Sequence, residues 1–222
     1  MNGAVKGVLF DFGYTLFAHK SLADTIVACA AALGRPIDQQ TATSIATAID
    51  AAAMSPEELA HPRDLDAVVW RERWALLYGA ADHWVDGLGA AIDVDMHDPQ
   101  QWVPYAQTHT TLQALHAAGV AIGIVSNTGW DIRAAFAAHS LDAFVTSFTL
   151  SCEAGAVKPA AKIFRGACES LRLQPGDVVM VGDDPRSDAG AVMVGIRTFL
   201  VPAARPGSDN DIGSIVRLAG VG

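Results

Sequence analysis

Cysteine is scarce in this chain. The three cysteines, Cys29, Cys152 and Cys168, are an odd number and show no Cys-x-x-Cys spacing. Disulfide frameworks use an even set of cysteines and structural zinc sites use paired ligands, so the sequence predicts neither. We expect all three side chains to be buried apolar groups.

The chain also lacks a long apolar run and an excess of positive charge. Its longest alanine-rich apolar stretch, residues 25–33, is too short to span a membrane, and no basic segment with a cleavable apolar run opens the chain. Asp and Glu number 24 against 15 Lys and Arg, and this net charge of −9 is the wrong sign for a nucleic-acid-binding surface. We therefore expect a cytoplasmic protein with no membrane or nucleic-acid partner.

The apolar content is sufficient for a full core. Of the 222 residues, 51% are hydrophobic and 18% are charged, which is typical of a globular protein. Near the start, an apolar run of strand-forming residues, 8–10, ends on Asp11, and Gly13 follows where the chain must turn. Open α/β sheets place their reactive groups at the carboxyl ends of buried strands, so Asp11 occupies a candidate active-site position.

The same pattern, an apolar run that ends near polar or charged residues, occurs three more times. The later runs are residues 121–125 before Ser126 and Asn127, residues 145–150 before Lys158, and residues 178–181 before Asp183 and Asp184. Helical patterns alternate with these runs. Such alternation predicts an α/β fold, a Rossmann-like parallel sheet with helices on both faces, built from residues 1–16 and 100–222.

Residues 17–99 show no strand pattern, so we predict an inserted all-helical domain there. Helices are predicted over residues 21–33, 38–54, 64–78 and 83–92, with Ser21, Asp38 and Asp64 opening the first three. A core helix is predicted over residues 102–118. Trp70 and Trp74 lie one helical turn apart, and we expect them to pack between helices of the insertion rather than against a substrate.

Taken in order, the polar residues at the strand ends are Asp11, Ser126, Lys158, Asp183, Asp184 and Asp188. Their order and repeated placement resemble the four motifs of the haloacid dehalogenase superfamily of phosphohydrolases, in the branch that carries a helical cap. The resemblance implies a lid that closes over the site and excludes water. It also implies Mg²⁺ as cofactor and a small phosphorylated metabolite as substrate. Whether the protein is a monomer or a homodimer stays open.

The resemblance gives the residues specific roles. Asp11 would attack phosphorus and form an aspartyl-phosphate. Asp11, Asp183 and the backbone carbonyl of Gly13 would bind Mg²⁺, with Asp188 or Asp184 as a further ligand. Asp184 and Asp188 have an alternative role as ordinary acids at a helix N-terminus.

The phosphoryl group needs a positively polarised site. Ser126 offers a hydroxyl and Asn127 a backbone N–H, as expected at a strand-to-helix turn. Lys158, one of only four lysines in the chain, would supply the fixed positive charge. An ordinary polar turn and a solvated surface lysine are the alternatives to these roles.

The pattern departs from the family at Gly13. Most phosphatases of this superfamily have there a second Asp that protonates the leaving alcohol, a contribution typically worth 10²- to 10⁴-fold. Three possibilities stay open: another group such as Tyr14, His19 or a water donates the proton; the protein is a 2-haloacid dehalogenase, a class that lacks both this Asp and the Mg²⁺ cluster; or it binds a phosphorylated ligand with little turnover. Because the later acids remain, we expect a Mg²⁺-dependent phosphohydrolase.

Overall fold

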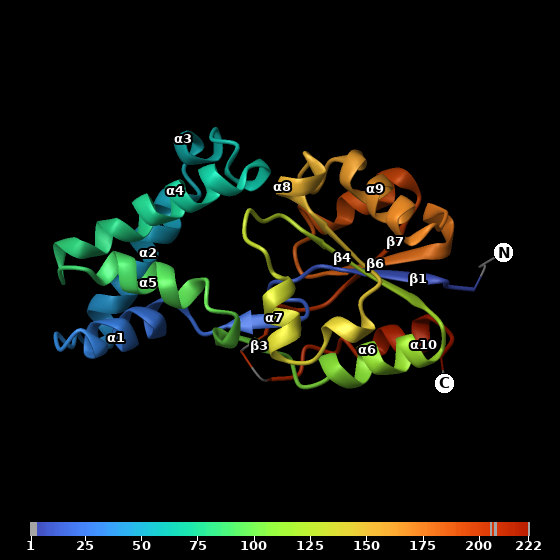
Figure 1. Cartoon of the computed structure of the whole chain (residues 1–222), viewed down its shortest axis with the longest axis horizontal. Helices are drawn as coiled ribbons and strands as arrows, with labels where there is room; N and C mark the ends of the chain where they lie inside the picture. The colour runs from blue at the N-terminus through green and yellow to red at the C-terminus, as the bar shows by residue number, and fades with distance from the viewer. Residues whose placement is uncertain (1–3, 205, 207, 222) are drawn as a thin grey trace.

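The centre of the protein is a parallel β-sheet, seen in a computed structural model that describes residues 4–204, 206 and 208–221. Its strands are β1 (Gly7–Phe10), β4 (Ala121–Ser126), β5 (Ser147–Leu150), β6 (Val178–Gly182) and β7 (Arg197–Leu200). They lie in the order β5-β4-β1-β6-β7, and every neighbouring pair is parallel. The strand that leads to Asp11 is therefore the central one (Figure 1). The predicted α/β fold with a parallel sheet is confirmed.

Helices cover both faces of this sheet, with α9 on one side and α6 and α10 on the other in Figure 1. Val8 and Phe10 share one apolar core with α6 (Thr108–Ala117), α7 (Arg133–Ala138) and α10 (Ser214–Leu218). Leu9 shares the opposite core with α9 (Ala161–Leu171) and the 3₁₀ helix η6 (Asp188–Val194). Because successive strand residues point to opposite faces, a sheet buried on both sides needs the continuous apolar run seen in the sequence. The shorter elements of the core are α8 (Ser151–Ala154), η4 (Asp142–Phe144) and η5 (Pro175–Asp177).

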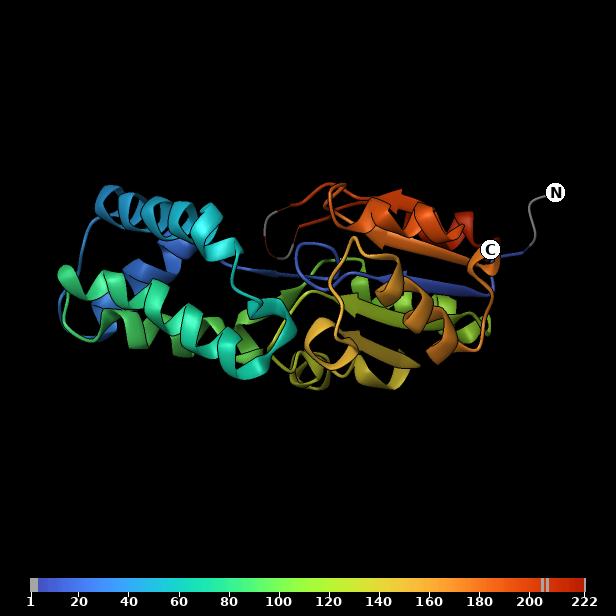
Figure 2. The ribbon, with the colours of Figure 1, turned by 90° about the horizontal axis from the view of Figure 1, so that it is seen from above.

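A second group of helices, named here the helical unit, spans residues 22–96. It consists of α1 (Leu22–Ala32), α2 (Gln39–Ala53), α3 (Pro56–Leu59), α4 (Ala67–Gly79) and α5 (Leu88–Met96), with the 3₁₀ turns η1 (Arg63–Leu65) and η2 (Ala80–His83); η3 (Pro99–Gln101) follows it. The unit has an apolar core of its own. In Figures 1 and 2 it lies beyond one end of the strands. The predicted N-caps are confirmed at Ser21 and Asp38, whose side chains accept backbone N–H groups at 3.1 and 2.7 Å.

The prediction that no strand occurs in residues 17–99 is wrong at its start. Phe17–His19 forms β2, which pairs antiparallel with β3 (Trp102–Pro104). These two strands carry the chain out of the core and back into it. A strand of three residues is too short to show a period in the sequence, and its partner lies on the far side of the helical unit in the chain.

Three predicted helix starts are also wrong. The helix predicted from His83 begins at Leu88, after the 3₁₀ turn η2. The helix predicted from Trp102 begins at Thr108. Val103 precedes a proline, and this position favours extended backbone, in agreement with β3. The N-cap of α4 is Asp66, whose carboxylate accepts the N–H groups of Val68 and Val69 at 2.8 and 3.0 Å, and not Asp64.

The cysteines are free, as expected, although only Cys29 and Cys168 are buried and Cys152 is half-buried. Within the described part of the chain, no helix has both the length and the apolar character needed to cross a membrane.

A buried ion cluster holds α3 and α4 of the helical unit together. The Glu58 carboxylate, which is 4% exposed, accepts hydrogen bonds from Arg73 Nε at 3.1 and 3.2 Å and from Arg63 Nη1 at 3.4 Å. The Arg63 guanidinium lies 4.9 Å from the ring centre of Trp74. The hydrogen bonds from Arg73, joined by the charges of both arginines, hold the pKa of Glu58 below its ordinary value despite its burial.

Glu58→Gln is expected to lower the free energy of unfolding at pH 7 by roughly 1–3 kcal/mol, because Arg63 and Arg73 lose their charged acceptor. A carboxylate with a lowered pKa stabilises the fold above its unfolded pKa of about 4.3 and loses this contribution as pH falls through the folded pKa. The difference in the free energy of unfolding between wild type and Glu58→Gln should therefore become smaller at acidic pH. Urea unfolding at pH 7 and at lower pH measures it. The neighbouring, exposed Glu57→Gln is the control, and an equal effect at Glu57 would contradict the prediction.

Candidate functional site

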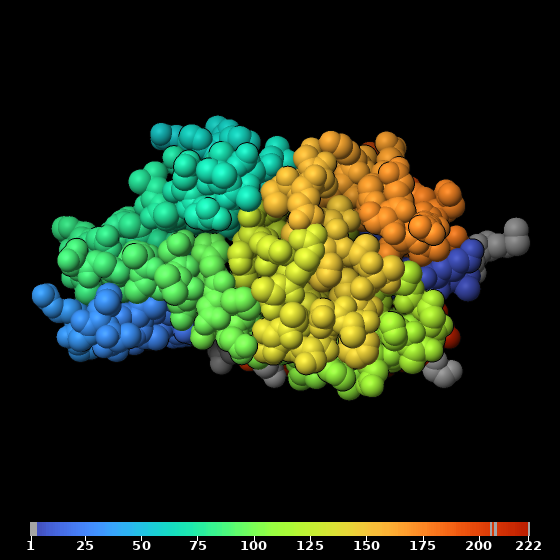
Figure 3. Space-filling view, viewed as in Figure 1, coloured from blue at the N-terminus to red at the C-terminus, as the bar shows by residue number. Residues whose placement is uncertain are grey.

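The site forms where the central strands end. Asp11 follows β1, Ser126 ends β4 and Asp183 follows β6, while Lys158 comes from the loop between α8 and α9. These four residues come together as the sequence predicted. One cavity of about 300 Å³ is lined by Asp11, Gly13, Ser126, Asn127 and Lys158, together with Trp70 of the helical unit and residues of the loop after β4. Figure 3 shows the helical unit, in blue to green, meeting the yellow-green segment that follows β4.

Three carboxylates gather in this site. Oxygens of Asp11, Asp183 and Asp188 lie within 4.8 Å of one another. The Lys158 ammonium lies 2.7 Å from Asp11 Oδ1 and 2.7 Å from Asp188 Oδ1. When ionised, the three acids exceed the one ammonium by two negative charges, which is the charge that a divalent cation would balance.

Neighbouring groups fix the orientation of each acid. The second oxygen of Asp188 accepts the backbone N–H of Asp184 at 3.1 Å, and Thr15 Oγ1 donates to Asp183 Oδ1 at 3.0 Å. A Cβ on Gly182 would lie only 2.1 Å from Asp188 Oδ2. Position 182 therefore has to be glycine for Asp188 to reach Lys158.

Asn127 holds Lys158 in place through its side chain. Its Nδ2 donates to the Lys158 carbonyl at 3.0 Å and its Oδ1 accepts the Lys158 N–H at 2.7 Å. This positioning role for the amide was not predicted, since the sequence argument concerned only the backbone N–H of Asn127. Ser126 is buried and borders the cavity.

Asp184 lies outside the carboxylate cluster. Its Oδ1 accepts the backbone N–H of Arg186 at 2.9 Å and its side-chain Nε at 3.3 Å. Burial would raise the pKa of Asp184, but these hydrogen bonds outweigh it and lower the pKa below its ordinary value. Of the two acids that the sequence left open, Asp188 is the one that the fold brings to Asp11 and Asp183.

Burial and the charges of neighbouring groups shift the pKa values of the residues in the cluster. Burial raises the pKa of Asp11, and the charge and hydrogen bond of Lys158 oppose this only in part. Burial also raises the pKa of Asp183, against the hydrogen bond from Thr15. Burial would lower the pKa of Lys158, but Asp11 and Asp188 outweigh it and raise the pKa above its ordinary value. The lysine is therefore a permanent positive charge at neutral pH.

Neither side chain suggested as a substitute acid lines the cavity. His19 is buried in β2, where Nδ1 lies 2.9 Å from the Lys20 carbonyl and Nε2 lies 3.4 Å from Asp95 Oδ2. Tyr14 is 45% exposed and has a φ of 58°, in the left-handed region that favours glycine. Burial of its hydroxyl and the charges of Asp50 and Asp183 raise the pKa of Tyr14, which makes it a weaker proton donor than a free tyrosine.

Three tryptophans also line the cavity: Trp70, Trp102 and Trp130. Trp70 packs on Trp74, with ring centres 5.7 Å apart, and also borders the cavity, a position that was not predicted. Trp74 packs inside the helical unit, with its ring 5.3 Å from that of Tyr78. A Cβ on Gly129 would lie 2.3 Å from the Cβ of Trp70, so the loop after β4 approaches α4 closely. This contact joins distant segments, and no local sequence pattern announces it.

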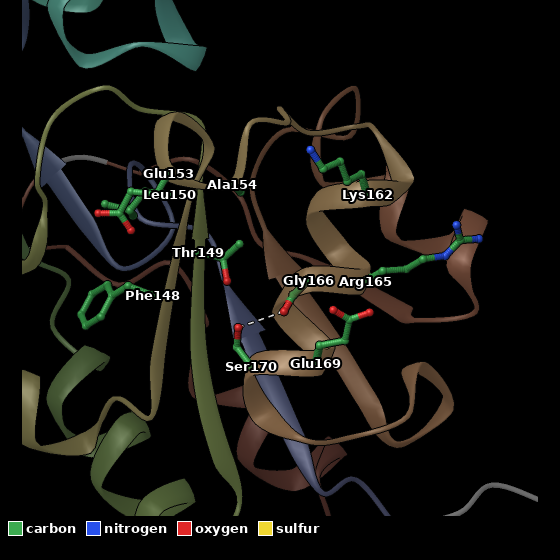
Figure 4. Close-up of a pocket in the computed structure, with 10 residues that line it drawn as sticks. All are labelled: Phe148, Thr149, Leu150, Glu153, Ala154, Lys162, Arg165, Gly166, Glu169 and Ser170. Carbon is green, nitrogen blue, oxygen red and sulfur yellow. Dashed lines mark hydrogen bonds between the residues drawn. The ribbon is translucent and has the colours of Figure 1, made fainter.

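A larger groove lies elsewhere, beside α9 and β5, and holds none of the predicted site residues. It has a volume of about 750 Å³ and its lining includes Phe148, Glu153, Lys162 and Arg165. Figure 4 shows Arg165 pointing away from the strand residues Phe148 and Thr149, whereas Lys162 extends the other way and its Nζ donates to the Gly155 carbonyl at 3.2 Å, so these charges do not converge on one point. Size alone does not make it the better candidate, because its polar groups lack a common target.

The parallel sheet with an acid cluster and a buried lysine at its carboxyl edge defines a class of hydrolases. A model of the haloacid dehalogenase-like hydrolases matches residues 5–192, and the chain belongs to this family. The predicted resemblance is confirmed.

One curated relative is a protein of Clostridium perfringens (strain 13 / Type A) described as a candidate pyrophosphatase, PpaX. It is 26% identical over 129 residues, which cover 54% of this chain and 58% of the relative. The match thus spans little more than half of either protein.

Two solved structures share the fold over nearly the whole chain. A HAD phosphatase from Thermococcus onnurineus is 21% identical with a TM-score of 0.65, and the match covers 97% of this chain and 98% of the other. The L-2-haloacid dehalogenase from Xanthobacter autotrophicus is 21% identical with a TM-score of 0.67, again over 97% and 98%. Because these two proteins are named for different reactions, the shared fold does not select between them.

Proposed function

We propose that this protein is a Mg²⁺-dependent phosphohydrolase that acts on a small phosphorylated metabolite through an aspartyl-phosphate. The observation that carries the proposal is the cluster of Asp11, Asp183 and Asp188 within 4.8 Å. Displacement of a halide by a carboxylate requires no such set of acids beside the nucleophile. We further expect the enzyme to work in the cytoplasm, as a monomer or homodimer, without nucleic acid or membrane.

The donor atoms of the cluster fit Mg²⁺. This ion prefers carboxylate oxygens and is bound through few protein ligands, with the remaining positions left to water and phosphate oxygens. Asp11, Asp183 and Asp188 would supply these ligands, with the Gly13 carbonyl as a further one. When bound, Mg²⁺ would neutralise charge on the phosphoryl oxygens and on the nucleophile.

With Asp11 as nucleophile, hydrolysis of the phosphate ester proceeds as two successive displacements at phosphorus. An Asp11 oxygen forms a bond to phosphorus while the bond from phosphorus to the leaving oxygen breaks, and the leaving oxygen keeps the electron pair. A water oxygen next bonds to the same phosphorus while the bond from phosphorus to the Asp11 oxygen breaks; Asp11 leaves as a carboxylate with the electron pair, and the protons of the water depart on the released phosphate. Lys158 and Ser126 would hold the phosphoryl oxygens in both steps, and Asn127 would position Lys158.

The two other possibilities from the sequence stay as alternatives. A 2-haloacid dehalogenase would use Asp11 on carbon, and the solved dehalogenase structure shares the fold. A binding module with little turnover would use the same cavity without completing the second displacement. The acid cluster favours the phosphohydrolase over the dehalogenase, and turnover measured in Mg²⁺ separates it from the binding module.

Removal of divalent metal is expected to lower hydrolysis of 4-nitrophenyl phosphate by about 10²- to 10³-fold, since electrostatic stabilisation by the ion is worth several kcal/mol. Activity is assayed with Mg²⁺, with excess EDTA, and after Mg²⁺ is restored. In parallel, halide release from 2-chloropropionate is followed in EDTA. Halide release that persists in the chelator, with no phosphate release in Mg²⁺, would identify a dehalogenase instead.

A further inference from the structure

The cavity beside Asp11 is bounded by an aromatic wall, defined here as Trp70, Trp102 and Trp130. They come from α4, β3 and the loop after β4, and all three are half-buried. The Phe12 ring lies 4.9 Å from Trp102 and 6.0 Å from Trp130, and the two indoles lie 6.0 Å apart. Phe12, Trp102 and Trp130 therefore form adjoining ring surface on one face of the cavity, and Trp70 lines the cavity beside them.

The polar edges of two of these indoles are bonded elsewhere. Trp70 Nε1 donates to His97 Nε2 at 3.3 Å, and Trp102 Nε1 donates to the Met96 carbonyl at 3.0 Å. Their carbon edges are left for the cavity. At Gly13, where the family's acid would stand, a Cβ would lie 3.7 Å from Cζ3 of Trp102. Hydrocarbon of Trp102, not a proton donor, thus faces position 13.

The charges around the cavity argue against an anionic leaving group. Among the described residues that line it, Lys158 is the sole cation, and it already pairs with Asp11 and Asp188. Asp184 adds a negative charge at the rim. A second phosphate or a carboxylate on the substrate would meet this acid and ring surface with no cation to balance it.

We propose that the substrate is the phosphate monoester of a flat, uncharged aromatic hydroxyl compound, whose ring lies against the aromatic wall. This inference rests on the proposed function. Aromatic rings favour offset or edge-to-face contact with other rings, which the three indoles offer. The missing acid points the same way: a phenolic oxygen, with a pKa near 10, leaves as the aryloxide with its electron pair and then takes a proton from water, whereas an aliphatic alkoxide is far more basic.

The experiment compares 1-naphthyl phosphate, which has a ring, with acetyl phosphate, which has a good leaving group and no ring, both in Mg²⁺. Trp70→Leu and Trp130→Leu are each expected to lower kcat/KM for 1-naphthyl phosphate by about three- to tenfold and to leave that for acetyl phosphate within twofold. Trp84→Leu is the matched control, since Trp84 is an exposed tryptophan of the same helical unit and does not line the cavity. Trp84→Leu should leave kcat/KM unchanged for both substrates.

Equal losses on both substrates, or no loss on either, would overturn the aromatic class while leaving the phosphohydrolase intact. Faster hydrolysis of phosphocholine than of 1-naphthyl phosphate would also overturn the aromatic class, because the tryptophans would then bind a cationic group through their ring faces. If wild type hydrolyses neither test substrate, the proposed function fails. The aromatic wall is then tested by calorimetry on the Asp11→Asn variant. The affinity of this variant for 1-naphthyl phosphate is compared with its affinity for inorganic phosphate, and both are measured again after Trp130→Leu is added. If 1-naphthyl phosphate binds more tightly than inorganic phosphate and Trp130→Leu removes the difference, the aromatic wall is supported. If the two ligands bind equally, the aromatic wall is contradicted.

Discussion

Asp11→Asn is expected to lower kcat for aryl phosphate hydrolysis by about 10⁴- to 10⁶-fold, the loss typical of removing a nucleophile. The amide has nearly the shape of the carboxylate, but its oxygen is a poor nucleophile. It also has a weaker charge interaction with Lys158, whose ammonium lies 2.7 Å from Asp11 Oδ1. Single-turnover phosphate release in saturating Mg²⁺ measures the effect, because it separates chemistry from product release.

Two controls accompany this variant. Asp86→Asn changes an exposed acid of the helical unit and should retain full activity. Thermal unfolding of Asp11→Asn checks that the protein is folded; its Tm should not fall, because burial already disfavours the charged form of Asp11. Retention of more than a tenth of the wild-type kcat would remove Asp11 from the role of nucleophile.

Gly13→Asp is expected to raise kcat/KM for alkyl phosphates by about 10²- to 10⁴-fold, the usual worth of a general acid. The backbone accepts a side chain here, because φ is not in the left-handed region and a new Cβ would make ordinary contact, 3.7 Å from Trp102 Cζ3. Aryl phosphates should gain much less, because their leaving oxygen needs less help. A series of phosphate esters with leaving groups of graded pKa measures the change as a flatter dependence of rate on that pKa.

Gly13→Asn is the matched control, since it places a group of the same size at Gly13 without a transferable carboxyl proton. A gain with Asp and not with Asn would mean that the family's acid is simply missing. Losses in both variants, on every ester, would instead mean that the site was built around the space beside Trp102. The first result supports general-acid rescue and the second contradicts it.

Much of the core could be predicted from the sequence, because its signals are local. The apolar runs at 8–10, 121–125 and 178–181 each became a buried strand, since a strand covered on both faces requires apolar side chains in succession. The polar residue at the end of each run then had to lie at one sheet edge, because parallel strands end together. This reasoning placed Asp11, Ser126 and Asp183 correctly.

Where the sequence argument failed, the deciding contact joins distant parts of the chain. Nothing local distinguishes Phe17–His19 as a strand, because its partner is Trp102–Pro104. The helix propensity around Trp102 was overridden by that pairing. The helical spacing of Trp70 and Trp74 predicted their packing but gave no sign that Trp70 also borders the cavity.

The sequence by itself determined that this protein has an α/β core with an acid after β1, a lysine between β5 and β6 and further acids after β6. Only the tertiary structure decided that Asp188 and not Asp184 joins Asp11 and Asp183, and that Trp102 faces the missing acid's position while Trp70 and Trp130 line the same cavity. The positions of the core strands follow from apolar runs of a few residues, which the sequence shows directly. The choice between two neighbouring acids depends on hydrogen bonds with Lys158, Asp184 N–H and Arg186, and such choices are fixed only when the segments meet.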